Sequence, residues 1–262
     1  MVLRAAILAC FANVACMSSF NSLPIHIPAA FPYAVPTVET GSPSSEGVSD
    51  AIRSESIAGK VIVVDPGHGG PDGGAKSGSG LLEKEITLEI SKKLADYLRQ
   101  GGAIVYMTRS TDRDLASDAD RRAKRRHMGD LRSRVAYIHS KQPDMVLSVH
   151  CNAVPSSAWT GAQTIYMKGN EEGKRLAVLI QNEFKANLLP TKRQADDMDT
   201  LYLLKRVSGP VALSEVGFLS NPGEAASLAT PRYQSNVAWC IYLAAVRYFA
   251  EEGSPRAPHH PS

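Results

Sequence analysis

Residues 61–85 read VIVVDPGHGGPDGGAKSGSGLLEKE, an apolar run that ends in a glycine-rich loop and leads into a charged segment. The run at 60–64 is continuously apolar, as expected of a strand buried on both faces. His68 follows this strand, and Glu83 lies fifteen residues later, where a helix is expected to begin. Both side chains are metal ligands. The glycines taken alone also suit a phosphate-binding loop, but the complete motif of such a loop is not matched.

Strand and helix patterns alternate along the rest of the chain. The alternation predicts an α/β fold with a single domain, in which helices flank a central, mostly parallel (mixed) sheet of about six strands. A further short helix is expected at Asn221, because an N-cap residue is followed by proline at the first helical position. The expected strands are 60–64, 103–107, 144–149, 162–167 and 211–216, and the expected long helices are 86–98, 118–140, 172–187 and 233–251.

Composition is typical of a globular protein with a substantial core. The chain has 262 residues, of which 44% are hydrophobic and 21% are charged, so one ordinary catalytic domain is expected. A net charge of +3 gives no indication of nucleic acid as a partner. The basic cluster at 121–126 is either a solvated helix face or a site for an anionic partner, and nearby aspartates favour the first interpretation.

The two ends of the chain differ from the middle. Residues 1–20 are predicted to be a signal peptide or a short N-terminal membrane anchor, with a cytosolic leader as the alternative. A lipoprotein site at Cys10 or Cys16 is disfavoured. Residues 21–58 have the composition of a Pro/Ser-rich linker, and residues 253–262 that of a disordered tail. The catalytic domain is therefore expected at 59–252.

Two later strands supply further candidate groups. His150 closes the apolar run 145–150, and with His68 and Glu83 it completes a set of two histidines and one carboxylate, a common catalytic zinc set. Glu215 lies inside the apolar strand 211–216, where a carboxylate needs either an arginine partner or a chemical role. Burial raises the pKa of a carboxyl group, which suits a general base. Cys151 is interpreted as a small buried residue rather than a thiol nucleophile.

Four motifs together resemble a known family. DPGHGG, LLEKE, SVHCNA and SEVGFLSN occur in this order and resemble the zinc-dependent N-acetylmuramoyl-L-alanine amidases of type 3, over about residues 60–250. The resemblance implies Zn²⁺ as cofactor, with His68, Glu83 and His150 as its ligands and Glu215 as the catalytic residue. Glu85 is the competitor for the second ligand. The implied reaction hydrolyses the amide between N-acetylmuramic acid and the L-alanine of the stem peptide.

Other segments are similar to one branch of that family. Residues 202–205 and 215–226 resemble the germination-specific amidases of spore-forming bacteria. This similarity implies export across the cytoplasmic membrane to the cell wall or forespore cortex space, and a role in forming muramic lactam. The implied partners are peptidoglycan and either an activator protein or a cortex-modifying deacetylase. The pair Ile138-His139 stands where many relatives have Ala-Asn, so no binding role is carried over to His139.

Several roles remain open. Asp65 is expected either to orient a metal-bound imidazole or to cap its turn, and Asn152 is a candidate substrate or second-shell contact. Arg109 and Arg134 either face carboxylates of the peptide or form surface ion pairs. A related zinc exopeptidase or deacylase, and a non-catalytic wall-binding module, are the alternative functions. A His/His/Glu set also accommodates divalent ions other than zinc.

Overall fold

A six-stranded sheet forms the centre of the computed structural model, which describes residues 56–188 and 191–253. The strand order is β2-β1-β3-β6-β4-β5. All neighbouring strands are parallel except β4 and β6, which are antiparallel. The predicted mixed α/β fold is confirmed. The strands are β1 (Val61–Pro66), β2 (Ile104–Met107), β3 (Met145–Asn152), β4 (Gln163–Met167), β5 (Asp196–Met198) and β6 (Val211–Phe218).

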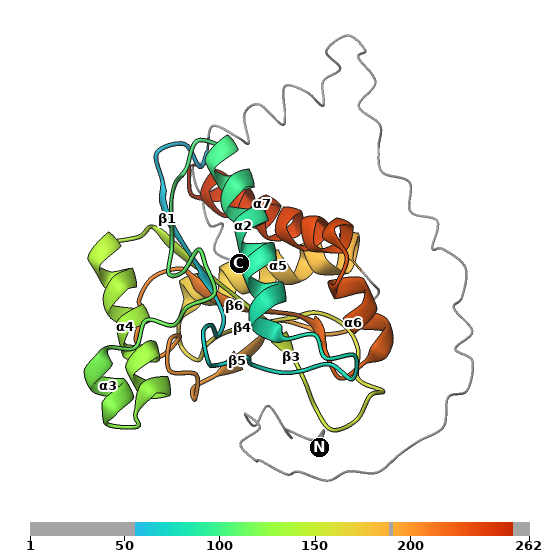
Figure 1. Ribbon diagram of the computed structural model, residues 1–262. Helices are drawn as coiled ribbons and strands as arrows, with labels where there is room; N and C mark the ends of the chain where they lie inside the picture. Colours follow the sequence, from blue (N-terminus) through green and yellow to red (C-terminus); the bar gives the residue numbers. More distant parts are fainter. Residues whose placement is uncertain (1–55, 189–190, 254–262) are drawn as a thin grey trace. The chain divides into compact units, whose positions relative to one another are not determined.

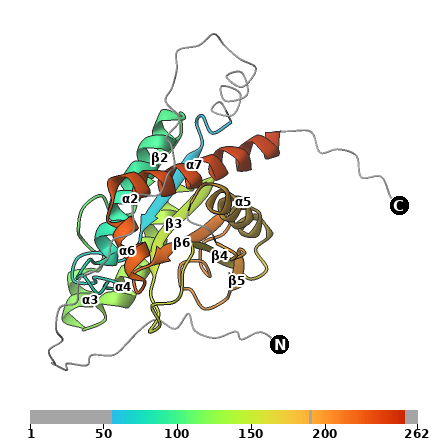
Figure 2. The ribbon, with the colours of Figure 1, turned by 90° about the vertical axis from the view of Figure 1, so that its right-hand side faces the viewer.

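Helices cover both faces of the sheet (Figures 1 and 2). Helices α2, α5 and α7 pack together on one face, and α4 covers part of the other. The single helix expected at 118–140 is wrong, because Lys124 adopts a left-handed φ of 54° and separates α3 from α4. The helices are α2 (Glu83–Gln100), α3 (Asp118–Arg122), α4 (Arg126–Lys141), α5 (Glu171–Asn187), α6 (Pro222–Leu228) and α7 (Pro231–Gly253).

Two apolar layers explain why the central strands have no polar face. Ile62 and Val64 contribute to the layer beneath α2, α5 and α7, whereas Val63 contributes to the layer that contains α4 and residues 203–207. Successive side chains of a strand point to opposite faces, so a strand covered on both sides must be apolar throughout. The continuous apolar run of β1 is therefore a consequence of its central place in the sheet.

Strand register brings three polar side chains into one row. His150 of β3 is paired with Glu215 of β6, and Glu215 is paired in turn with Gln163 of β4. Residues directly opposite each other on adjacent strands point to the same face. The register of β3 against β6 shifts between His150 and Asn152, and such a bulge re-aims the side chains beside it.

The predicted signal or anchor lies outside the described residues, as do residues 21–55 of the predicted linker and 254–262 of the predicted tail. Ile57, at the end of the predicted linker, is instead buried in the core. Within the described part of the chain, no helix combines the length and the apolar character needed to cross a membrane.

Candidate metal centre and adjacent carboxylate

Three potential metal ligands converge from separate elements. His68 lies two residues after β1, Glu83 is the first residue of α2, and His150 is in β3. The Nε2 atom of His68 is 3.1 Å from Glu83 Oε2, and the Nδ1 atom of His150 is 3.1 Å from Glu83 Oε1. One ligand atom from each residue lies within 4.8 Å of the others. Two imidazoles and a carboxylate at this separation fit the donor set of a catalytic zinc site.

Charge in the cluster favours a cation. Burial raises the pKa of Glu83, but hydrogen bonds with His150 and His68 outweigh it and hold this pKa well below its usual range. Burial lowers the pKa of His68, but hydrogen bonds with Asp72 and Glu83 outweigh it and raise the pKa to about 10. The cluster thus binds a proton tightly. A metal ion competes with protons for the same nitrogen and oxygen atoms.

Asp72 orients the first histidine. Its Oδ2 atom is 3.0 Å from His68 Nδ1, which leaves Nε2 directed at Glu83. A histidine ligand commonly donates its other ring N–H to a carboxylate, which fixes its orientation. Asp72 was not predicted from the sequence. The available signal was a carboxylate four residues after His68 in the same loop.

Asp65, the predicted candidate for that orienting role, is placed elsewhere. Its buried carboxylate accepts hydrogen bonds from Thr108 Oγ1 at 2.6 Å, Ser148 Oγ at 2.9 Å and Arg134 Nη1 at 2.8 Å. Burial opposes ionisation, but Arg134 and Thr108 outweigh it and lower the pKa of Asp65. Asp65 therefore anchors the end of β1 beneath the cluster instead of touching an imidazole.

Arg109 and Arg134 lie under the loop that carries His68. Their exposed fractions are 0% and 2%, so the alternative of surface ion pairs is wrong. Arg109 donates to the carbonyls of Pro66 at 3.2 Å and Gly67 at 2.7 Å, and Arg134 donates to those of Pro66 and His68. These carbonyls lie at and just beyond the end of β1, and buried backbone carbonyls need hydrogen-bond donors. The arginines thus support the backbone of the loop.

Two glycines make room for the ligands. A Cβ atom at Gly67 would lie 2.4 Å from His150 Cε1, and one at Gly74 would lie 2.5 Å from Glu83 Oε2. Gly74 also has a φ of 65°, which side chains disfavour. The glycines of the opening motif therefore serve close packing around the candidate metal site.

Glu215 stands beside the cluster without a partner. Its Oε2 atom is buried and accepts no hydrogen bond. Burial raises the pKa of Glu215 to about 7, although the charge of His150 opposes the rise. Glu215 forms no ion pair with any arginine in the described ranges, so the alternative of an arginine-paired structural glutamate has no support. A carboxylate with a buried oxygen that has no hydrogen-bond partner is costly to keep, which marks Glu215 as a candidate functional group.

The other candidates have less direct positions. Asn152 is the buried last residue of β3, and its carbonyl accepts a hydrogen bond from the backbone of Leu219. Glu85 is exposed on α2, away from the cluster. Cys151 is buried, and burial raises the pKa of its thiol well above the ordinary value, so it is not an activated nucleophile.

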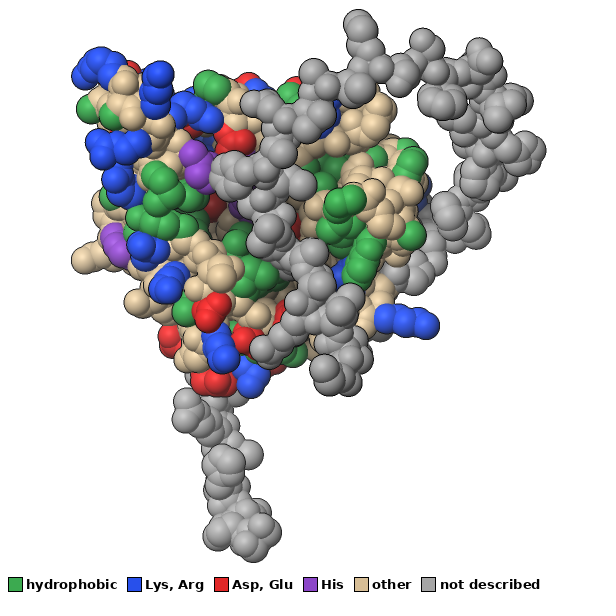
Figure 3. All heavy atoms as spheres, turned by 90° about the horizontal axis from the view of Figure 1, so that it is seen from below, with side chains coloured by type: hydrophobic (Ala, Val, Ile, Leu, Met, Phe, Trp, Pro, Cys, Tyr) green, Lys and Arg blue, Asp and Glu red, His purple; other side chains and the backbone are tan. Residues whose placement is uncertain are grey.

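The basic cluster at 121–126 is partly neutralised. Arg121 and Arg126 both form ion pairs with Asp114, and Arg121 also pairs with Asp118. Lys and Arg side chains gather on the left of Figure 3, the side on which Figure 1 shows α3 and α4. The interpretation as a solvated helix surface agrees with these pairs.

A mixed α/β sheet with two histidines and a glutamate beside a second, partly buried carboxylate has the arrangement of a metal-dependent hydrolase. The sequence profile of the N-acetylmuramoyl-L-alanine amidases matches residues 62–247. The chain belongs to this family, and the resemblance inferred from its motifs is confirmed.

Known relatives and solved structures agree with the assignment. The germination-specific N-acetylmuramoyl-L-alanine amidase of Bacillus subtilis (strain 168) is 47% identical over 199 residues, which cover 76% of this chain and 84% of that protein. The CwlD amidase of Clostridioides difficile, solved in complex with the GerS lipoprotein, is 35% identical with a TM-score of 0.70, covering 72% of this chain and 98% of that one. The catalytic domain of CwlV, an amidase from Bacillus (Paenibacillus) polymyxa, is 29% identical with a TM-score of 0.63, covering 72% of this chain and 97% of that one.

Proposed function

We propose that this amidase is zinc-dependent and cleaves the bond between N-acetylmuramic acid and the L-alanine of the stem peptide. His68, Glu83 and His150 would hold the ion, and Glu215 would act as the general base. The observation that carries the proposal is the position of Glu215, which is paired in strand register with His150 and has a buried oxygen without a hydrogen-bond partner.

The residues divide the work as follows. When bound, Zn²⁺ would supply Lewis-acid chemistry that polarises the amide carbonyl and acidifies water. Glu215 would accept a proton from the attacking water and pass it to the departing alanine amine. In the metal-free chain burial raises the pKa of Glu215 to about 7, and a raised proton affinity suits a group that both accepts and donates a proton near neutral pH. Asp72 would keep His68 in position through its hydrogen bond to Nδ1.

We further propose a role in maturing spore-cortex peptidoglycan outside the cytoplasmic membrane. The support is the 47% identity to a germination-specific amidase. The CwlD amidase was solved with a lipoprotein, so a lipoprotein activator is a proposed partner here as well. A cortex-modifying deacetylase that acts after stem-peptide removal remains a second proposed partner.

Mass spectrometry of digested peptidoglycan, combined with elemental analysis of the purified protein, tests the proposal. The expected products are free stem peptides that begin with alanine and glycan strands that carry unsubstituted lactyl carboxylates. About one zinc per chain is expected. Faster cleavage of a simple peptide than of a muropeptide would favour the exopeptidase or deacylase alternative. Absence of both metal and product would favour the wall-binding module.

A further inference from the structure

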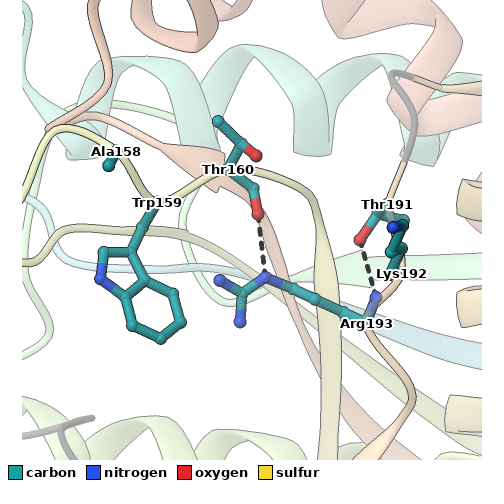
Figure 4. A pocket seen from close by; sticks show the side chains of 6 residues that line it. All are labelled: Ala158, Trp159, Thr160, Thr191, Lys192 and Arg193. Carbon is teal, nitrogen blue, oxygen red and sulfur yellow. Dashed lines mark hydrogen bonds between the residues drawn. The ribbon is translucent and has the colours of Figure 1, made fainter.

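A pocket of about 670 Å³ is lined in part by Arg193, which is hydrogen-bonded to Gln163, the last member of the row His150, Glu215 and Gln163. Two segments line it, one following β3 and the other preceding β5 (Figure 4). The lining contains two cationic side chains and no acidic one, so it favours an anionic ligand. The lining residues are Ala158, Trp159, Thr160, Thr191, Lys192 and Arg193.

Gln163 links this pocket to the candidate catalytic residue. Arg193 Nη1 donates to Gln163 Oε1 at 3.1 Å, and Gln163 is the register partner of Glu215. Adjacent strands lie about 4.8 Å apart. Adding one hydrogen-bonded side chain places the guanidinium on the order of 8–10 Å from the backbone of Glu215.

The guanidinium of Arg193 is held in place with donors left over. Its Cζ atom lies 5.1 Å from the ring centroid of Trp159 and 4.7 Å from that of Phe218. Its Nε atom donates to the carbonyl of Thr160 at 3.0 Å, as drawn in Figure 4. Among the described residues Arg193 has no ion-pair partner, and its Nη2 atom makes no hydrogen bond. An arginine held against two aromatic rings is well suited to bind a carboxylate.

Side chains at the start of α6 hold the segment that lines the pocket. The buried carboxylate of Glu224 accepts hydrogen bonds from Gly161 N and from Phe218 N, both at 2.6 Å. Asn221 Nδ2 donates to the carbonyl of Ser157 at 2.8 Å. These bonds tie the segment that carries Trp159 to the end of β6. A recognition site built in this way loses little conformational entropy when a ligand binds.

We propose that this pocket binds a carboxylate of the stem peptide and that Arg193 determines specificity for it. The inference rests on the proposed function. Two extended residues of a peptide span about 7 Å, so a carboxylate on the residue after L-alanine reaches Arg193 while the scissile amide lies at Glu215. Lys192, which is exposed, adds long-range attraction for the same charge.

Two matched substrates test the inference. One is N-acetylmuramoyl-L-alanyl-D-glutamate, and the other is the same molecule with both glutamate carboxylates converted to carboxamides. We expect the wild type to show a higher kcat/KM for the charged substrate, and Arg193→Gln to lower that value about 10- to 100-fold, as for loss of a charge-assisted hydrogen bond. The value for the carboxamide should change little. Arg193→Lys should recover part of the preference.

The control is Arg206→Gln. The Cζ atom of Arg206 lies 3.6 Å from the ring centroid of Tyr202. Arg206 precedes β6, whereas Phe218, which contacts Arg193, is the last residue of that strand. Loss of Arg206 should therefore leave the preference unchanged. Equal losses on both substrates for Arg193→Gln would overturn the inference, because they would indicate a structural role. An unchanged preference in Arg193→Gln would overturn it as well.

Calorimetric titration of the Glu215→Gln protein separates this inference from the proposed function. Both substrates are titrated into Glu215→Gln and into the double variant that also carries Arg193→Gln. Tighter binding of the charged substrate, lost in the double variant, supports the pocket even if the wild type hydrolyses neither substrate, in which case only the proposed reaction fails. Equal affinities for the two substrates overturn the pocket.

Discussion

Glu215→Gln tests the proposed chemistry most directly. The substitution keeps the shape of the side chain and breaks no hydrogen bond at Oε2, because that atom has no partner. It removes the group that would exchange protons with water and the leaving amine. Loss of a general base lowers rates about 10²- to 10⁴-fold, equivalent to about 3–5.5 kcal/mol of activation free energy.

The same substitution should change how stability depends on pH in the metal-free protein. Burial in the fold raises the pKa of Glu215 from its ordinary value of 4.5 to about 7. Between these values the folded chain holds a proton that the unfolded chain releases, so stability falls as pH rises through this window. The loss amounts to about 3 kcal/mol above pH 7. Glu215→Gln cannot ionise and should lack this loss.

Three measurements check these expectations. The first is peptide release from peptidoglycan, the second is zinc content, and the third is denaturant unfolding at pH 5 and pH 8. A matched control is Glu183→Gln, which removes another buried carboxylate, paired with Arg247 at 2.7 Å, and should lower stability while activity remains. Activity of Glu215→Gln close to that of the wild type, or loss of zinc together with activity, would refute the assignment of Glu215 as a base.

Three further predictions follow from the geometry. Glu83→Gln should lose most bound metal in elemental analysis, whereas Glu85→Gln should retain it, because Glu83 contacts both histidines and Glu85 is exposed; equal retention would contradict the ligand assignment. Gly67→Ala should weaken metal binding in a chelator competition, because its Cβ would lie 2.4 Å from the His150 ring, while Gly78→Ala has nothing within 4 Å and should behave as the wild type; identical affinities would contradict the steric argument. Asp65→Asn should lower the free energy of unfolding by about 3–5 kcal/mol at pH 7, as for a broken buried ion pair. The deficit should shrink at acidic pH, because the lowered pKa of Asp65 confers stability only while the group is ionised. A deficit independent of pH in denaturant titrations would contradict this.

Much of the fold was predictable because it depends on local patterns. The central strands are buried on both faces and therefore appear as continuous apolar runs. The three-residue strand β5 has no expected counterpart, since Asp196–Met198 is too short and too polar to show a period. The break between α3 and α4 was also missed, because Lys124 is an ordinary helix former whose left-handed φ does not follow from its side chain.

The candidate site was predictable in its chemistry and less so in its supports. His68, Glu83, His150 and Glu215 stand out because polar groups inside or just after apolar runs need a reason to be there. His150 was expected to close its strand, but β3 continues to Asn152, whereas Glu215 lies inside β6 as expected. Carboxylates and arginines around them are common residue types, so spacing alone did not separate Asp72 from Asp65.

The order of residues was sufficient to infer the alternation of strands and helices, the four candidate chemical groups and the family, because these depend on local periodicity and side-chain type. Packing determined the remaining features. Asp72 contacts His68, Arg109 and Arg134 lie beneath the loop, Glu215 lacks a partner, and Arg193 faces the pocket beside Gln163. Most of these relations bring together atoms of residues that are tens of positions apart in the chain. Their separation of a few ångströms is determined by hydrogen bonds and burial in the folded protein, which local sequence does not encode.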